Sequence, residues 1–259
     1  MTKCLILAAG QGTRLRPITN DKPKCLTPLA GKPMLIRQVE TLKSQGIDNI
    51  HVATGYRSDQ IEKLGFDTSF NSKFDSTNMV ETLFSALDFI KGDEDLIISY
   101  GDIVYNRNNL GKLLASNDEL SIMVDKDWKE LWSLRLDDPL SDAETLKLEN
   151  GFIIELGKKP NSYDEIEGQY TGLIKIRGDK VLAFIDFYQS LAKDKEYDGK
   201  DFYNMYMTSF IQLLINSGWE VKASLVNNGW LEVDTVEDLN TYENLYHSGG
   251  LNSFINLDE

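Results

Sequence analysis

The sequence has few of the residues that build metal centres and covalent cross-links. Its 259 residues include two cysteines, Cys4 and Cys25, and two histidines, His51 and His247. The cysteines lie on or beside predicted core strands, and their spacing suits neither a disulfide framework nor a thiolate metal site. Two histidines are too few to suggest a zinc centre. A disulfide-stabilised domain is therefore excluded, and a zinc protein is disfavoured.

The sequence also lacks long hydrophobic runs and an excess of basic charge. No run reaches the roughly 18 apolar residues that a membrane helix needs, and residues 1–3 lead into an apolar strand rather than a signal peptide. We therefore expect a soluble cytoplasmic protein. Acidic residues outnumber basic ones by 41 to 27, the net charge is -14, and there is no basic tail. This balance disfavours nucleic-acid binding.

Basic residues are nevertheless concentrated near the start of the chain. The apolar stretch Leu5–Ala9 ends at Gly10 and Gly12, and a cluster of basic side chains with a single acid, Asp21, follows. The cluster consists of Arg14, Arg16, Lys22, Lys24 and Lys32. Glycines let the backbone turn tightly and bring its N–H groups close to an anion, while arginine and lysine neutralise phosphate oxygens. The segment therefore predicts a phosphate-binding loop.

This loop differs from two common nucleotide-binding motifs. No Gly-Lys-Ser/Thr follows the glycines, which excludes a Walker P-loop, and the third glycine and distal acid of the dinucleotide fingerprint are missing. The pattern Leu7-Ala8-Ala9-Gly10-x-Gly12-x-Arg14, followed by Lys22-Pro23-Lys24 and Gly31-Lys32-Pro33, resembles the nucleotidyltransferase superfamily. Its members join a nucleoside triphosphate to a small phosphorylated compound and release pyrophosphate. The resemblance covers essentially the whole chain and is tightest over residues 5–33.

Alternating strand and helix patterns predict a Rossmann-like α/β fold. Strands are expected at residues 3–9, 50–54, 68–71 and 95–100, with helices beginning at Pro33, after Ser58 and at Asn78. Such alternation indicates a mostly parallel mixed sheet with helices on both faces. Short, turn-rich segments between residues 120 and 176 predict a small inserted antiparallel lobe at the far edge of the sheet.

Later segments complete the predicted domain. Helices are expected again at residues 180–192 and 202–217, and strands at 221–225 and 230–233. We expect a single nucleotidyltransferase domain over residues 1–259. It would comprise a nucleotide-binding half (about 1–119), an acceptor-binding lobe (about 120–230), and a metal-binding aspartate followed by a C-terminal helix (231–259).

Two aspartates stand at predicted strand ends, where open α/β sheets bind ligands. Asp102 follows the apolar stretch at 96–100, and Asp234 follows the strand at 230–233. The resemblance implies that both hold Mg²⁺, which proteins bind through one or two carboxylates together with substrate phosphates. Each aspartate could instead merely cap the helix after it, because Asp is a favoured N-cap residue and Thr235–Asp238 has the form of a capping box.

The basic loop residues and the glycine turn have distinct expected roles. Lys24 is expected to stabilise charge on the α-phosphate as it becomes five-coordinate, and Arg14 to hold the departing pyrophosphate. These two are the predicted catalytic residues, and the acceptor's own oxygen serves as the nucleophile. The residues expected to bind the nucleotide are Leu7, Ala8, Ala9, Gly10, Gly12, Thr13, Arg14, Gly55, Tyr56 and Asn78.

Departures from the sugar-phosphate branch of the superfamily bear on the acceptor. Lys158-Lys159-Pro160 stands where that branch has Glu-Lys-Pro, which binds the acceptor's phosphate, and residues 167–172 lack its sugar-binding pattern. Asp234-Thr235 is not followed by the Gly-Thr ending of the hexose-phosphate enzymes. The chain is more similar to cytidylyltransferases that act on phosphocholine or aminoalkylphosphonates.

Aromatic side chains could enclose a cationic acceptor by cation–π attraction. Trp128 and Trp132 are spaced i, i+4 in a charged segment, and Asp201-Phe202-Tyr203 resembles the acid and tyrosine pair of the phosphocholine enzymes. Tryptophan and tyrosine in such a lobe could equally be core residues. The residues expected to bind the acceptor are Trp128, Trp132, Lys159, Tyr170, Asp201, Tyr203 and Trp230.

These features predict a Mg²⁺-dependent cytidylyltransferase. It would couple CTP to a small zwitterionic phosphate or phosphonate, such as phosphocholine or 2-aminoethylphosphonate, and release pyrophosphate. The alternatives are a sugar-1-phosphate nucleotidyltransferase using UTP, dTTP or CTP, and a non-catalytic nucleotide-sensing homologue. Retention of Arg14, Lys24, Asp102 and Asp234 argues against the sensor, because a binding protein does not need both metal acids. The choice between CTP and UTP, the number of metal ions and the oligomeric state stay open.

Overall fold

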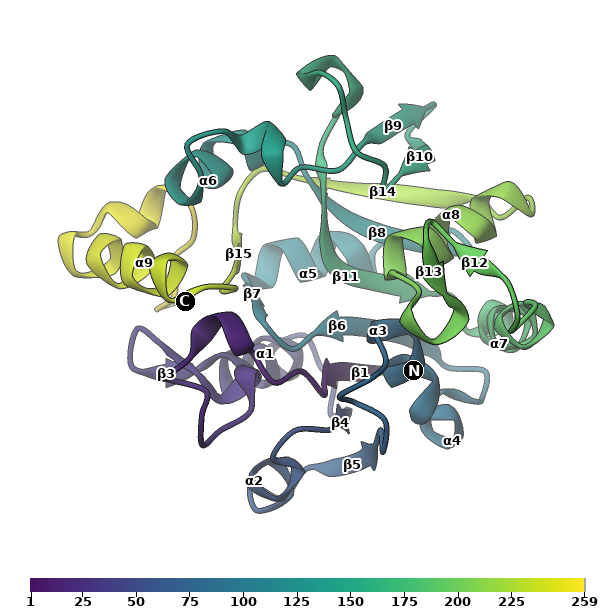
Figure 1. The fold of residues 1–259 in the computed structure, drawn as a ribbon, viewed down its shortest axis with the longest axis horizontal. Helices are drawn as coiled ribbons and strands as arrows, with labels where there is room; N and C mark the ends of the chain where they lie inside the picture. The colour runs from purple at the N-terminus through teal and green to yellow at the C-terminus, as the bar shows by residue number, and fades with distance from the viewer. Residues whose placement is uncertain (259) are drawn as a thin grey trace.

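A single mixed sheet organises the molecule (Figure 1). In the computed structural model, which describes residues 1–258, nine strands make up this sheet. From one edge to the other they are β5 (Asp67–Phe70), β4 (Asn49–Thr54), β1 (Thr2–Ala8), β6 (Asp95–Tyr100), β11 (Gln169–Ile176), β8 (Leu120–Asp125), β14 (Val221–Val226), β10 (Phe152–Leu156) and β9 (Leu146–Glu149).

Strand direction changes across the sheet. β1 runs parallel to β4 and β6, and β4 runs parallel to β5. β11 lies antiparallel between β6 and β8, β14 is parallel to β8, and β10 and β9 continue antiparallel at the far edge. The predicted mostly parallel mixed sheet is confirmed.

Helices cover both faces of the sheet. Successive strand residues point to opposite faces, so each strand contributes side chains to two hydrophobic cores. In β1, Cys4 and Ile6 belong to one hydrophobic core, while Leu5 and Leu7 belong to the other. A strand buried on both faces reads as a continuous apolar run, which is why β1 was predictable from the sequence. The first core receives α1 (Met34–Ser44), α2 (Ser58–Glu62), α5 (Arg107–Leu114), α6 (Trp128–Arg135) and α9 (Val236–Ser248). The second receives α3 (Met79–Ser85), α4 (Leu87–Ile90), α7 (Val181–Ser190) and α8 (Met207–Asn216).

Short elements connect these layers and carry much of the chemistry described below. The small antiparallel pairs are β2 (Pro28–Leu29) with β3 (Lys32–Pro33), β7 (Ile103–Tyr105) with β15 (Trp230–Glu232), and β12 (Glu196–Tyr197) with β13 (Lys200–Asp201). The 3-10 turns are η1 (Thr13–Leu15), η2 (Lys24–Leu26), η3 (Pro139–Ser141), η4 (Tyr163–Glu165), η5 (Gly178–Lys180), η6 (Phe202–Asn204) and η7 (Gly250–Ser253).

Segments from the two ends of the chain lie side by side. The loop after β1 and helix α9 occupy the same side of the molecule, at the left of Figure 1. The backbone N–H of Ala30 donates to Glu243 Oε1 at 2.7 Å and joins them. This packing brings the basic loop close to the residues that precede α9.

Two sequence predictions of local structure need correction. The helix predicted at 202–217 is interrupted, because Asp201 Oδ1 accepts the backbone N–H groups of Tyr203 and Asn204 and caps the short turn η6; α8 begins only at Met207. The strand predicted at 230–233 is present as β15, but it lies outside the main sheet and pairs with β7. No helix in the described part of the chain is long and apolar enough to cross a membrane.

Candidate active site

The glycine loop after β1 is shaped to hold Lys24. Gly12 adopts a left-handed backbone conformation with φ of 63°, and its carbonyl accepts hydrogen bonds from Leu15 N at 2.9 Å and Thr19 Oγ1 at 2.6 Å. A Cβ atom at Gly12 would lie 3.0 Å from Lys24 Cβ. Glycine is therefore required here both for the turn and for close packing against the lysine.

Lys24 joins two acids that come from distant parts of the chain. Its Nζ donates to Asp102 Oδ2 at 2.7 Å and to Asp234 Oδ1 at 2.8 Å. Asp102 follows β6, and Asp234 follows β15. Arg14 NH1 lies 2.5 Å from Asp234 Oδ2, although 69% of the arginine side chain is exposed. The structure thus brings together the four residues to which the sequence assigned catalysis and metal binding.

A third acid, Glu232, belongs to the same cluster, and it was not among the site residues predicted from the sequence. One carboxylate oxygen from each of Asp102, Glu232 and Asp234 lies within 4.8 Å of the others. Glu232 precedes Asp234 by two positions, the spacing that places strand residues on one face, and this was the available signal. Burial and the charge of Asp102 raise the pKa of Glu232 to about 7, while the charges of Arg135 and Lys24 act in the opposite direction.

The cluster supplies the carboxylate oxygens that a hard divalent cation takes as ligands. Mg²⁺ prefers hard oxygen ligands and is commonly held by one or two carboxylates with substrate phosphates, and the three acids supply such oxygens. Burial alone would lower the pKa of Lys24, but the charges of Asp102, Asp234 and Glu232 and the hydrogen bond to Asp102 outweigh it and raise the pKa. Lys24 is therefore cationic at neutral pH.

The capping alternative for the two aspartates does not fit the structure. Asp102 is followed by β7, and the N-cap of α9 is Thr235, whose Oγ1 accepts the N–H of Asp238 at 3.0 Å. Asp238 Oδ2 in turn accepts the N–H of Asp234 at 3.0 Å and that of Thr235 at 2.9 Å. The capping box thus fixes the backbone of Asp234 and leaves its carboxylate for the cluster.

Arg135 pairs with Glu232, a member of the acid cluster, and with Asp238, which fixes the backbone of Asp234. Its Nε lies 3.0 Å from Asp238 Oδ1 and its NH1 lies 3.4 Å from Glu232 Oε2, with 5% of the arginine side chain exposed. The guanidinium also lies 5.5 Å from the centre of the Trp132 ring. Arg135 therefore connects α6 to both β15 and α9.

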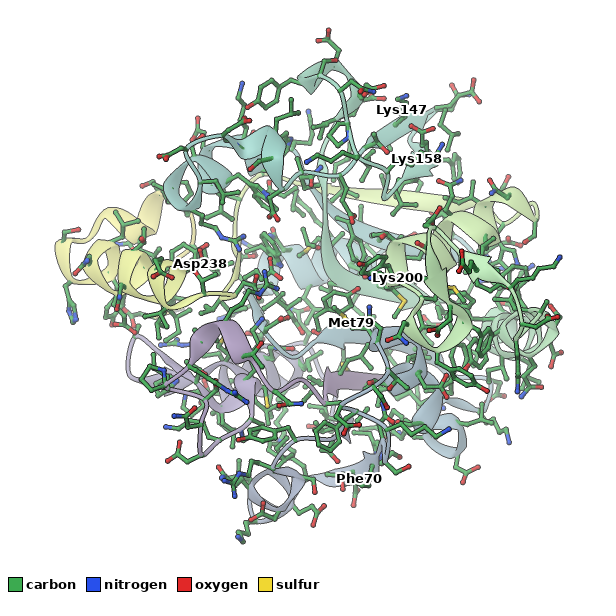
Figure 2. All side chains as sticks on the ribbon, in the orientation of Figure 1. Phe70, Met79, Lys147, Lys158, Lys200 and Asp238 are labelled. Atoms are coloured by element: carbon green, nitrogen blue, oxygen red, sulfur yellow. The ribbon has the colours of Figure 1, made fainter. Side chains whose placement is uncertain are left out.

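A first cavity of about 180 Å³ opens beside Lys24 and Asp102. Of the residues predicted to bind the nucleotide, residues 7–10 and Asn78 line it. The sequence missed its other walls, which include Phe74, Thr77, Met79, Thr82 and Tyr100. Figure 2 labels Met79 near the centre of the molecule and Asp238 to its left on α9.

Other predicted nucleotide residues stand behind or beside this cavity. Gly55 packs so closely on the loop that a Cβ atom there would lie 2.4 Å from Phe74 Cβ. Tyr56 N donates to Ala9 O at 3.1 Å, and Tyr56 Oη donates to Asn20 O at 2.6 Å. Gly12, Thr13 and Arg14 form the turn on the side of the acid cluster. Asn78 Oδ1 accepts the N–H of Met79 at 2.8 Å, so this residue also caps α3.

A second cavity, also of about 180 Å³, adjoins the first through Tyr100, which lines both. Three of the predicted acceptor residues, Trp132, Tyr170 and Trp230, line this second cavity. Its acidic wall consists of Asp142, Glu144 and Glu232. Gly172, with φ of 80°, makes room for the shared tyrosine, because a Cβ atom there would lie 2.7 Å from the Tyr100 ring.

The other four predicted acceptor residues lie elsewhere. Trp128 is buried against Trp132, with ring centres 5.8 Å apart. Lys159 Nζ donates to the carbonyls of Leu140 and Ser141. Asp201 caps η6, and Tyr203 on that turn accepts the N–H of Asn78 through its carbonyl at 3.0 Å. The structure therefore does not gather a single cage from all seven residues.

Comparison with known proteins agrees with this architecture. The chain is 49% identical over 244 residues to CTP:phosphoglutamine cytidylyltransferase of Campylobacter jejuni, which covers 91% of this chain and 96% of the relative. It is 27% identical to choline-phosphate cytidylyltransferase of Streptococcus pneumoniae, over 94% of this chain and 97% of the relative. A solved structure of the CTP:phosphocholine cytidylyltransferase of that species has the same fold, with a TM-score of 0.68, 20% identity, and coverage of 95% of this chain and 99% of the other.

A protein-family model also matches the first half of the chain, which contains the glycine loop, Lys24 and Asp102. The model for the MobA-like NTP transferase domain matches residues 4–134. The identity of 49% over nearly the full length of a curated enzyme points to the same family. The chain belongs to the family of MobA-like NTP transferases and is a nucleotidyltransferase.

Proposed function

We propose that this enzyme transfers the cytidylyl group of CTP to a small, nitrogen-bearing phosphorylated or phosphonate acceptor and releases pyrophosphate with the help of Mg²⁺. The observation that carries the proposal is the position of the charged cluster between two cavities. Lys24 and Asp102 line the first cavity, Glu232 lines the second, and Tyr100 lines both. A triphosphate in the first cavity and an acceptor in the second would meet at this cluster.

The first cavity suits a nucleoside. Its walls combine the backbone of residues 7–10 with the side chains of Asn78 and Thr82. Backbone N–H and C=O groups and a side-chain amide offer the donors and acceptors that a pyrimidine edge requires. Both curated relatives described above are cytidylyltransferases by name, which supports CTP as the nucleotide.

The reaction would use the charged groups of the chain to position phosphates and stabilise charge. An acceptor oxygen forms a bond to the α-phosphorus while the bond from that phosphorus to the pyrophosphate oxygen breaks. Lys24 would donate to the α-phosphate as negative charge develops on it, and Arg14, largely exposed at the rim, would hold the departing pyrophosphate. Asp102 and Asp234, with Glu232 beside them, would hold Mg²⁺, which when bound neutralises phosphate charge.

The second cavity suits an acceptor with a nitrogen-bearing head. Aromatic rings of Trp132, Tyr170 and Trp230 and carboxylates of Asp142 and Glu144 line it. Such walls attract a cation by cation–π and charge interactions. The two relatives are named for phosphoglutamine and choline-phosphate, and both of these compounds carry nitrogen. We therefore expect phosphorylated glutamine, phosphocholine and 2-aminoethylphosphonate to be better acceptors than a hexose 1-phosphate.

A grid of substrates tests the proposal. Pyrophosphate release is measured with CTP, UTP, dTTP and ATP, each paired with phosphorylated glutamine, phosphocholine, 2-aminoethylphosphonate and glucose 1-phosphate at saturating Mg²⁺. We expect release with CTP and at least one nitrogen-bearing acceptor, and loss of release when EDTA is added. A preference for glucose 1-phosphate would replace the proposal with the sugar-nucleotide alternative, and binding of CTP without turnover on any acceptor would support the sensor.

A further inference from the structure

The turn that carries Asp102 is held from several sides. The backbone N–H of Gly101 donates to Leu7 O at 2.9 Å, and the N–H of Val233 donates to Asp102 O at 3.1 Å. A Cβ atom at Gly101 would lie 2.7 Å from Leu7 O, so the turn packs directly on β1. These contacts join the turn to the strand before the glycine loop and to the residue that precedes Asp234.

Gln38 on α1 holds the same turn from the core. Its Nε2 donates to Tyr100 O at 3.0 Å and to Ile103 O at 2.8 Å, the carbonyls on either side of Asp102. Its Oε1 accepts the hydroxyl of Ser99 at 2.7 Å. Both amide N–H groups and the amide oxygen are therefore paired, and the reverse orientation would turn the oxygen toward two carbonyls.

Gln38 stands among apolar residues, where an amide is costly unless it is paired. Just 1% of Gln38 is exposed, and Leu35, Val39 and Leu42 on the same helix belong to the first hydrophobic core. An apolar side chain in such surroundings would need no partners, whereas an amide removed from water does. All the pairing of this amide is directed to residues 99–103, the segment that contains Asp102. The glutamine therefore serves the turn rather than the packing of α1.

We infer that Gln38 is a positioning residue for Asp102, because its amide fixes the carbonyls on both sides of this acid. The inference rests on the proposed function, in which Asp102 helps to hold Mg²⁺. The fixed turn directs the Asp102 carboxylate to Lys24 Nζ, 2.7 Å away, and keeps it with the other acids of the cluster. A displacement of such a group by about 1 Å can lower a rate roughly 100-fold. Gln38 lines neither cavity, so it acts only through the turn.

Gln38→Met tests this role, because methionine has a similar length and cannot donate a hydrogen bond. We expect kcat for pyrophosphate release to fall roughly ten- to hundredfold. Two further measurements need no turnover. In enzyme with CTP but no acceptor, the dissociation constant of Mn²⁺, which takes the same oxygen ligands as Mg²⁺, should rise at least about fivefold by electron paramagnetic resonance. Exchange of the Gly101 amide hydrogen, followed by NMR, should become at least about tenfold faster relative to the amides of β8.

Gln212→Met is the matched control. Gln212 on α8 makes the same kinds of contact with β10, since its Oε1 accepts the N–H of Leu156 at 2.9 Å and its Nε2 donates to Ile154 O at 3.4 Å. This variant should leave kcat, the Mn²⁺ affinity and Gly101 exchange within about twofold of the unmodified enzyme, because the site is distant from the turn. Should Gln38→Met not fold, Gln38→Glu repeats the test, because a carboxyl group leaves at most one donor for the two carbonyls.

Circular dichroism and thermal unfolding establish that each variant is folded. A purely structural glutamine would affect the unfolding temperature and leave the Mn²⁺ affinity and kcat unchanged, and this result in a folded Gln38 variant overturns the inference. Equal changes in Gln38→Met and Gln212→Met overturn it as well. Absence of pyrophosphate release by the unmodified enzyme with every acceptor would instead overturn the proposed function, while Mn²⁺ binding and Gly101 exchange would still decide the role of Gln38.

Discussion

At the scale of single residues, the cluster at Lys24 is held by opposite charges in a small space. Lys24 has 13% of its side chain exposed, Asp102 has 17% and Asp234 has 11%. Little water screens these charges, so each interaction is stronger than it would be on the surface. Because the groups are already placed, a bound phosphate would meet charges that need little reorganisation.

The first prediction concerns the acids that we propose to hold Mg²⁺. Asp102→Asn or Asp234→Asn should each lower kcat by at least ~100-fold at saturating Mg²⁺, because transition-state electrostatics are lost. The measurement is steady-state pyrophosphate release with CTP and the preferred acceptor. Asp179→Asn, which alters an exposed acid paired with Arg177, serves as the control. Near-normal turnover in either cluster variant would contradict the metal assignment.

The second prediction separates Lys24 from its basic neighbours. Lys24→Ala should depress kcat, whereas Lys22→Ala and Lys32→Ala should change mainly KM, because Lys24 alone among these three described lysines has hydrogen bonds to the acid cluster. Lys32 pairs with Glu40 at 2.6 Å instead. Full kinetics for the three variants check this, and small, equal effects would mean that the loop acts only through its diffuse positive field.

Sequence reasoning located residues that follow strand ends or glycine turns, and it missed those that long-range packing delivers. Arg14 follows the glycine turn, and Asp102 and Asp234 follow predicted strand ends. Lys24 was predicted instead from the Lys22-Pro23-Lys24 motif of the family resemblance, and the four residues meet in the structure. Tyr100 was missed as a wall, because only its packing against Gly172 places it between the cavities. Asp201 is placed by its own capping hydrogen bonds, which compete with any role toward a ligand.

At the scale of elements, Arg135 ties α6 to the segment that carries Asp234. The pair of Arg135 and Asp238 is almost fully buried, with 5% and 4% of the side chains exposed. A buried charge without its partner is strongly unfavourable, more so than the intact pair is favourable. The position of Asp234, which lies just before α9, therefore depends on Arg135 in α6.

We accordingly predict that Arg135→Met lowers the free energy of unfolding by about 3–5 kcal/mol, because Asp238 and Glu232 lose their buried partner. Urea unfolding at pH 7 measures this change. Arg177→Met removes an exposed pair with Asp179 and should cost less than about 1 kcal/mol. Equal changes in the free energy of unfolding for the two variants would mean that the buried pair contributes no more to stability than the exposed pair.

The same pair predicts a loss of stability in acid. Burial acts to raise the pKa of Asp238, but the hydrogen bond and charge of Arg135 and the N–H groups of Thr235 and Asp234 outweigh it and lower the pKa. Because the folded-state pKa lies below the unfolded value, the stabilisation is present at neutral pH and is lost as pH falls through the folded pKa. Asp238→Asn should therefore flatten the acid limb of the curve of unfolding free energy against pH, and an unchanged slope would contradict this.

Elements were predictable where burial dictates the pattern. β1, β4 and β6 read as apolar runs because neighbouring strands and helices cover them on both faces. The helix α6 was not predicted, because its charged sequence has a weak apolar stripe and its stability comes from Trp132 stacked on Trp230 and from Arg135. The pairing of β15 with β7 joins segments far apart in the chain, and no local pattern specifies it.

At the scale of the whole molecule, a continuous sheet joins the two regions expected to bind the nucleotide and the acceptor. β11 pairs with β6 on one side and with β8 on the other, so the strands of the first half are hydrogen-bonded to those of the second. Tyr100 at the end of β6 lies 5.7 Å from Tyr170 on β11, measured between ring centres. A change in either region is therefore transmitted through shared backbone hydrogen bonds and shared side chains.

The last prediction is that the whole chain unfolds as one cooperative unit and that CTP stabilises both regions together. All four tryptophans lie between residues 128 and 230, whereas every residue that lines the proposed nucleotide cavity lies between Leu7 and Asp102. Urea unfolding followed by tryptophan fluorescence should therefore coincide with unfolding followed by far-ultraviolet circular dichroism. With Mg²⁺ and CTP at 100 times its dissociation constant, both curves should shift by about 2.7 kcal/mol, because a ligand that binds only the folded state stabilises the entire cooperative unit. Separate transitions, or a shift confined to circular dichroism, would instead mean that the nucleotide half and the acceptor lobe unfold independently despite the sheet they share.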